Sequence, residues 1–289
     1  MGMESVYKLS VVLNMVDQLT APMGRASQNL SSRLSGLQSG FGMAALAGGG
    51  MTAAGVGITN GMMKIAGSTF ETQDALAELK SLGITDLKAV EDAARQFSDT
   101  WAGTTKADFI TAAYDIKSGI ASLTDEGVAQ FTELAGLTAK ATKSTTGEMT
   151  SLFATGYGIY KGYYSELSDL EFGEMFAGGI ATAVKAYKTS GSEMASAISA
   201  LGGSATSANV PLEEQLSVLG MLQATMSGSE AATKYKALLN AATGAGEKLG
   251  LNFLDANNQL RSLPEILGIL KGKYGDTIDA VEKKQIKEA

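Results

Sequence analysis

The side chains that most often carry enzyme chemistry are scarce in this sequence. It contains no cysteine and no histidine, which excludes thiolate nucleophiles, imidazole acid–base catalysis and the common zinc sites. Three carboxylates, Asp169, Glu171 and Glu174, lie close enough in sequence to be considered as an acid–base pair. Glu171, however, follows Ser168 at the spacing of a capping box at a helix N-terminus. We therefore predict solvated carboxylates at a helix start, no catalytic residue and no enzymatic activity.

A cluster of tyrosines offers a second kind of chemistry, the stacking of aromatic rings on nucleic-acid bases. Its members are Tyr157, Tyr160, Tyr163 and Tyr164, and the neighbouring cation is Lys161. Nucleic-acid-binding domains usually present a basic face, whereas this chain has a net charge of −7 and a pI of about 4.8. Packing between helices is therefore the better interpretation, and we expect no sequence-specific nucleic acid among the partners.

A run of glycines, Gly48 to Gly50, suggests a phosphate-binding loop, but it follows no predicted strand and lacks the lysine of a P-loop. We expect no bound cofactor and no metal ion. With 45% hydrophobic residues among 289, the chain can bury a core in one or two domains. Aromatic residues make up only 7% and prolines number three, which favours helices over a β-sandwich.

Helix starts are marked by hydroxyl side chains followed three residues later by glutamate, as at Ser68, Thr145, Ser168 and Ser190. Further N-cap candidates are Thr85, Thr104 or Thr105, and Thr124, and Pro211 suits a first helical turn. Together with the apolar periodicity, these signals predict helices over residues 69–82, 86–99, 105–119, 125–142, 146–164, 169–188, 191–202, 211–226, 229–243 and 264–274.

Two short segments break the helical pattern. Residues 5–16 alternate apolar and polar side chains with a period of two, which favours a strand. Residues 251–263 place the turn-forming sequence Asp255 to Asn258 between two apolar pieces, which suggests a small hairpin. We therefore expect an elongated, multi-helix, all-α fold with a small irregular or β element near each end.

Residues 34–63 contain no charged side chain, and small residues recur there every fourth position. They are Ala45, Gly49, Ala53, Gly57 and Gly61. On a helix these residues form a smooth stripe that allows another helix to approach closely. Three interpretations stay open: a helical interface between copies of the chain, a segment that enters a membrane, or a flexible linker. Its many glycines make it a poor permanent membrane span.

Several segments between about Phe70 and Gly275 follow one another in a distinctive order. They are FETQDALAELKSLG, the stretch from Ala89 to Leu123, FTELAGLTAKATKSTTGEMTSLF, the stretch from Ser190 to Gln223, and LGLNFLDANNQLRSLPEILGIL. In order and spacing they resemble the core region of phage tail tape measure proteins. VVLNMVDQLTAPM near the start is similar to an Asp-x-x-Thr-Ala-Pro signature at the beginning of some members. The resemblance covers about two thirds of the chain, and the tyrosine-rich stretch at residues 156–176 departs from it.

The resemblance implies a domain organisation and a role. The implied segments are an N-terminal strand and helix at 1–33, the uncharged Gly/Ala-rich helical segment at 34–66, a tape measure core domain at 67–275, and the start of a charged helix at 276–289. A tape measure protein sets the length of the tail tube during assembly and leaves the tube to assist genome ejection through the host envelope.

The resemblance also implies partners and a location. The partners are further copies of the chain, three in our hypothesis, the tail tube protein, baseplate or tail-tip hub proteins and tail assembly chaperones, with the host inner membrane as a possible contact of the 34–63 segment. The location is the lumen of the tail tube in the virion, and the bacterial host cytoplasm during assembly.

A secreted helical translocator or pore-forming protein is the alternative, because it would share the uncharged segment and the helical body. A wall hydrolase embedded in the chain is disfavoured by the lack of histidine and cysteine.

Overall fold

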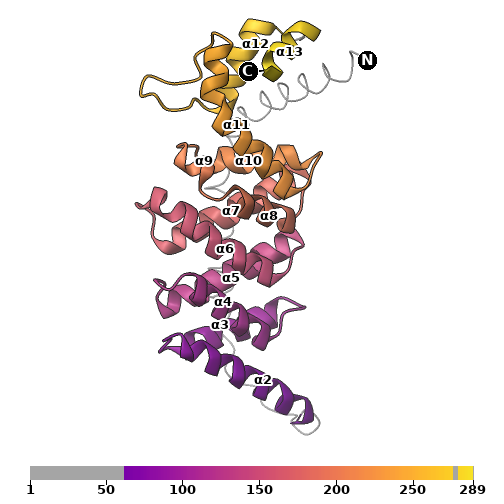
Figure 1. Cartoon of the computed structure of the whole chain (residues 1–289). Helices are drawn as coiled ribbons and strands as arrows, with labels where there is room; N and C mark the ends of the chain where they lie inside the picture. Colours follow the sequence, from indigo (N-terminus) through magenta and orange to yellow (C-terminus); the bar gives the residue numbers. More distant parts are fainter. Residues whose placement is uncertain (1–61, 276–278, 289) are drawn as a thin grey trace.

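The fold is an elongated stack of α-helices, seen in a computed structural model that describes residues 62–275 and 279–288 (Figure 1). No β-strand occurs in the described ranges, and the all-α prediction is confirmed. The helices are α2 (Met62–Ser81), α3 (Leu87–Thr100), α4 (Lys106–Gly119), α5 (Asp125–Thr142), α6 (Thr146–Tyr160), the 3-10 turn η1 (Lys161–Tyr164), α7 (Asp169–Tyr187), α8 (Gly191–Leu201), α9 (Ser204–Ser207), α10 (Leu212–Gln223), α11 (Gly228–Lys248), α12 (Leu263–Tyr274) and α13 (Ala280–Glu288).

The stack has two layers, because alternate helices of the chain pack side by side, with the short α9 left out of the alternation. Helices α2, α4, α6, α8 and α11 form one layer, and α3, α5, α7 and α10 form the other. Successive pairs therefore repeat a helical hairpin along one direction, as in repeat proteins whose units contact only their neighbours. The N-caps of the first layer, Thr105, Thr145, Ser190 and Ser227, recur roughly every 40 residues. The sequence analysis did not predict this repeat.

The predicted helix starts agree with the structure wherever a hydroxyl side chain accepts a bond from the first turn. Thr105, Thr145 and Ser168 form complete capping boxes, and Thr124 and Ser190 are N-caps without the reciprocal bond. Pro211 occupies the N-cap position of α10. Two predictions were wrong. Helix α2 begins at Met62, so Ser68 and Glu71 lie within it, and Asp86 rather than Thr85 caps α3.

Thr85 instead ties the α2–α3 turn to α5. Its backbone N–H and its hydroxyl both donate to Asp125 Oδ2, at 2.9 and 2.8 Å, and Asp86 N donates to the same oxygen at 2.8 Å. These bonds, with that from Asp86 N the largest effect, lower the pKa of the Asp125 carboxyl. The carboxylate at the first residue of α5 thus also fixes the start of α3.

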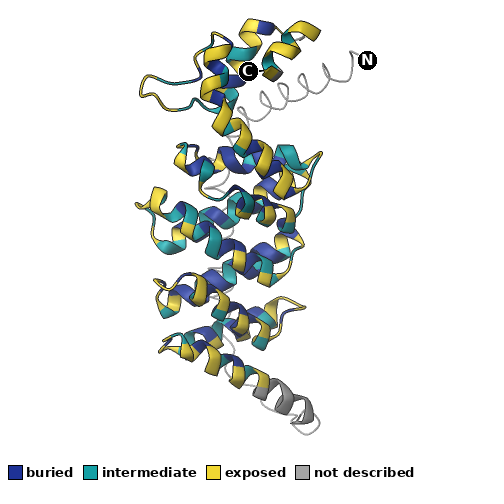
Figure 2. Cartoon of the chain, in the orientation of Figure 1, coloured by how far each residue is buried: buried dark blue, intermediate teal, exposed yellow. Residues whose placement is uncertain are grey.

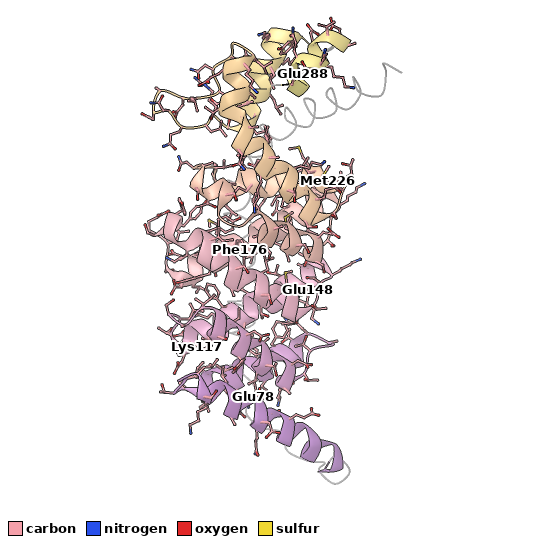
Figure 3. All side chains as sticks on the ribbon, viewed as in Figure 1. Glu78, Lys117, Glu148, Phe176, Met226 and Glu288 are labelled. Atoms are coloured by element: carbon pink, nitrogen blue, oxygen red, sulfur yellow. The ribbon has the colours of Figure 1, made fainter. Side chains whose placement is uncertain are left out.

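One continuous apolar core runs through the stack, and buried residues line the facing sides of the two layers (Figure 2). Phe176 lies near the middle of the stack (Figure 3), with its ring centroid 5.4 Å from that of Phe153 and 5.9 Å from that of Phe172. Glycine makes this packing possible, because a Cβ atom on Gly156 would lie 2.3 Å from Phe176 Cζ. The core thus depends on aromatic rings seated on glycines.

A separate structure, the C-terminal lobe (residues 249–274), follows the last helix of the stack. It rests on the second half of α11, where Phe253 packs with Ala242 and Ile266. The predicted hairpin is present: Leu254 and Leu260 form an isolated antiparallel bridge around the Asp255 turn. The predicted β element at residues 5–16 lies outside the described residues, and the four predicted domain segments stay a prediction.

Candidate functional surface

The three carboxylates considered for chemistry lie in the first turns of α7. Asp169 Oδ1 accepts a 2.8 Å bond from the Tyr157 hydroxyl. Glu171 accepts bonds from the backbone N–H and hydroxyl of Ser168, which lower its pKa. Glu174 is half-buried, and desolvation raises its pKa, with a smaller effect from the charge of Glu171. The arrangement is that of a capped helix, as predicted, and holds no acid–base pair.

The tyrosine cluster packs between helices, as predicted, with one exception. Tyr160 is buried and its hydroxyl donates to Gln215 Oε1 at 3.1 Å, while the Tyr164 hydroxyl accepts from Leu212 N at 3.2 Å. Both bonds join the α6–η1 segment to α10. Tyr163 is the exception, because 56% of its surface is exposed. The cluster, apart from Tyr163, therefore packs between helices.

A lysine side chain bonds to a backbone carbonyl six residues later in two of the turns that connect the layers. Lys117 Nζ donates to Leu123 O at 2.8 Å, just before α5, and Lys161 Nζ donates to Leu167 O at 2.9 Å, just before α7. In both turns the lysine stands six residues before the carbonyl and eight before the first residue of the next helix, Asp125 or Asp169. The carboxylate and lysine pair loosely, at 3.9 Å for Lys161 and Asp169. These charges therefore stabilise the two turns.

Polar side chains are also buried where α10 meets its neighbours. Gln215 is fully buried and its Nε2 donates to Val210 O at 2.7 Å and Thr206 Oγ1 at 3.3 Å. Its neighbour Glu214 is 7% exposed and accepts a 2.7 Å bond from Leu263 N at the start of α12. Desolvation raises the pKa of Glu214. These groups hold together the upper end of the stack in Figure 1.

A shallow groove of about 440 Å³ lies between α6 and α8, which pack side by side. It is lined by small and hydroxyl-bearing residues, Gly147, Ser151, Ser192, Ala195, Ser196 and Ser199, together with Glu148 and Leu152. Beyond Glu148 in α6 and Glu193 in α8, neither helix contains a charged residue. Depletion of charge is typical of the centre of protein–protein interfaces.

The groove offers hydroxyl groups and little else for chemistry. Glu148 is its ionisable group, and that carboxylate caps α6 by accepting from Thr145 N at 2.8 Å, which, with a further bond from Ser192, lowers its pKa. The sequence analysis missed this groove because its walls come from helices about 40 residues apart. The spacing of Ser192, Ser196 and Ser199 along one helical face was the available signal.

Two further features concern the whole described part of the chain. Residues 62–275 and 279–288 contain no group of three or more acidic side chains placed to hold a metal ion. Among the helices in these same ranges, none is both long enough and apolar enough to cross a bilayer. The stripe Ala45, Gly49, Ala53, Gly57 and Gly61 lies outside the described residues, so its interpretations stay predictions.

A comparison with known families identifies the kind of protein to which this elongated helical stack belongs. Residues 91–289 match the family described as phage-related minor tail protein, which is more than half of the chain. The chain belongs to this family. The match begins in α3 and includes the rest of the stack and the C-terminal lobe of this minor tail protein. No curated protein and no solved structure matches it.

Membership in this family makes the chain a phage tail protein. The resemblance noted from the sequence is therefore supported at the level of the phage tail. The stack from residue 91 onward, the groove between α6 and α8 and the contact between Glu214 and Leu263 all lie within the matched region of the minor tail protein.

Proposed function

We propose that this phage tail protein is a tape measure protein, a structural component that sets the length of the tail tube and leaves the tube to assist genome ejection. The observation that carries the proposal is the family match across an elongated stack of helices. The order of segments from Phe70 to Gly275, which resembles the tape measure core, is the second support. A structural role fits a chain without cysteine or histidine.

The architecture suits a protein whose own length determines the length of another structure. Each helical pair contacts its neighbours along one direction, so the extent of such a stack grows in proportion to the number of pairs. A compact globular domain would instead grow in all three dimensions, with a weaker relation between residue number and length.

The proposal includes the partners that the resemblance implies. They are other copies of the chain, three in our hypothesis, the tail tube protein, the baseplate or tail-tip hub proteins and the tail assembly chaperones. We place the protein in the tube lumen of the virion and in the host cytoplasm during assembly. We also propose that residues 34–63 contact the host inner membrane during ejection, because this segment contains no charged side chain.

Duplication of one helical pair tests the length-setting role. The turns at Lys143 and Lys188 are alike: each lysine has a left-handed backbone, with φ of 54° and 55°, and is followed by one residue and then an N-cap hydroxyl. A tandem copy of residues 145–189, inserted after Thr189, therefore rejoins the chain through the same turn. In phage whose own gene is replaced by this version, we expect tails that are longer by one constant increment in electron micrographs.

The control is phage carrying the unduplicated gene at the same locus, which should give tails of normal length. Tails of normal length with the duplicated gene, in particles that contain the longer protein, would show that the protein does not set length. It would then remain a tail component with another structural role.

A further inference from the structure

The C-terminal lobe meets the stack at a buried carboxylate. Glu214 lies in the first turn of α10 and is 7% exposed, and its Oε1 accepts a 2.7 Å bond from Leu263 N, the first residue of α12. In this position the carboxylate is near the positive end of the α12 dipole, which favours the contact. The contact spans 49 residues of sequence and joins the two parts of the molecule.

The surroundings of Glu214 do not neutralise its charge. Burial disfavours its ionisation most strongly, and the charge of the nearby Glu265 on α12 disfavours it further. On α11, Tyr235 is 1% exposed and its hydroxyl has no hydrogen-bond partner, although it senses the charge of Glu214. Because a buried carboxylate with one backbone donor is costly to desolvate, this joint is held less firmly than a well-packed apolar contact.

The lobe does not need the stack to complete its own bonds. Helix α12 has its own capping box, formed by Ser262 and Glu265. The end of α12 is tied to the end of α11 by a bond from Lys273 Nζ to Leu249 O. Its apolar side chains form two small clusters that are distinct from the main core. Of the α12 side chains, Leu263 also packs, partly buried, against the main core.

We propose that the Glu214–Leu263 contact is a latch, and that the C-terminal lobe can undock from α10 while it stays folded and attached to the end of α11. Undocking breaks the bond between Leu263 N and Glu214 and the packing of Leu263 on the main core, and it returns a buried carboxylate to water. The capping box, the Lys273 bond and the two lobe clusters persist, and because one cluster includes Ala242, the end of α11 from Ala242 onward moves with the lobe. Docked and undocked lobes therefore point α12 in two different directions relative to the stack. This inference does not depend on which role the protein has in the tail.

A distance measurement on the 1–289 chain tests the latch, and the lack of native cysteine makes labelling straightforward. Spin labels are attached to Ser199→Cys on α8 and Gly268→Cys on α12, both of which are exposed, and a Cβ atom on Gly268 meets open space. The docked lobe should give one narrow distance distribution. Glu214→Ala should add a second, separate distance, because the latch acceptor is lost.

Two variants are controls for this measurement. Glu214→Gln keeps an acceptor for Leu263 N and should retain the narrow distribution. Glu213→Ala removes an exposed carboxylate from the same turn and should also leave it unchanged. An unchanged distribution in Glu214→Ala would overturn the latch. So would a second distance accompanied by loss of amide protection in α10 and α11, because that result would mean unfolding of the stack rather than undocking of the lobe.

Discussion

The stack and the C-terminal lobe solve the same problem, the burial of apolar helix faces, at different scales. In the stack, one core runs from Ala75 on α2 to Tyr235 on α11, and aromatic rings sit on glycines of neighbouring helices. In the lobe, clusters of a few side chains each gather around Leu267 and Phe253. The difference indicates that stability is unevenly distributed, since local opening is easiest where few apolar contacts are broken.

The largest expected effect is in the stack. Phe176→Ala removes a fully buried ring that contacts Phe153, Phe172 and Tyr160. We expect a loss of about 3–5 kcal/mol in the free energy of unfolding, because the surrounding helices cannot collapse into the space. Urea denaturation followed by circular dichroism measures it. Leu238→Ala, at a side chain 39% exposed, is the control and should cost about 0.5 kcal/mol or less. Equal effects of the two changes would contradict a continuous core.

The matching change in the lobe should be smaller and local. Phe253→Ala removes a ring that is 4% exposed and packs with Ala242 and Ile266. We expect a loss of about 2 kcal/mol, confined to the lobe, because a small cluster can close around the space. Hydrogen exchange should accelerate in α12 and stay unchanged in α4 to α8. A shift of the main urea transition as large as that of Phe176→Ala would mean that lobe and stack unfold as one unit.

Glycine-to-alanine changes should have opposite signs in the two regions. Gly268→Ala in α12 adds a methyl group in open space and should stabilise that helix by about 0.5–1 kcal/mol, seen as slower amide exchange. Gly156→Ala in α6 places its Cβ atom 2.3 Å from Phe176 Cζ and should destabilise the stack. If both variants are stabilised, the packing of the aromatic rings on glycine is looser than the structure indicates.

The smallest effect is a response to pH that differs between the regions. In the stack, a backbone bond from Thr145 lowers the pKa of Glu148 from its ordinary 4.5, so this contribution is present above pH 4.5 and is lost as the pH falls through the folded-state value. At the joint, desolvation raises the pKa of Glu214 above 4.5, so its contribution is present below pH 4.5 and is lost as the pH rises through its folded-state value.

Acidification from neutral pH toward 4.5 should therefore favour docking of the lobe before it weakens the cap of α6. The labelled pair at Ser199 and Gly268 measures docking, and exchange of the first-turn amides of α6, corrected for intrinsic rates, measures the cap. Glu214→Gln should make docking independent of pH in this range. A pH response that persists in this variant would have to come from another group.

Most helix positions could be predicted from sequence, because capping is a local property. Thr145 and Ser168 each sit three residues before the carboxylate that completes their box, so the signal needs no knowledge of the fold. The two wrong N-cap predictions have different causes. In one the hydroxyl bonds to a carboxylate far away in sequence, and in the other the helix begins before the predicted cap. The Thr85 hydroxyl donates to Asp125, which is 40 residues away, and Ser68 lies within a helix that begins at Met62.

The layered repeat and the groove could not be predicted in the same way, because both depend on which helices become neighbours. Ser151 and Ser196 face one groove only because α6 and α8 pack side by side. In both turns the lysine, Lys117 or Lys161, stands eight residues before the aspartate that begins the next helix. This equal spacing was a sign of the repeat that the sequence contained. For the candidate site, the packing role of Tyr160 was predictable from charge and composition, whereas the stripe from Ala45 to Gly61 stays a prediction.

The neighbour-only packing of the helices also has a mechanical consequence. When the two ends of such a stack are pulled apart, the same force acts on each successive helical pair in turn. The weakest contact between neighbouring units therefore breaks first. We expect the contact between Glu214 and Leu263 to be the weakest one, since a buried carboxylate and the partly buried Leu263 make it. Under tension the protein should therefore lengthen at its C-terminal lobe in one early step, while the aromatic core around Phe176 carries load without opening.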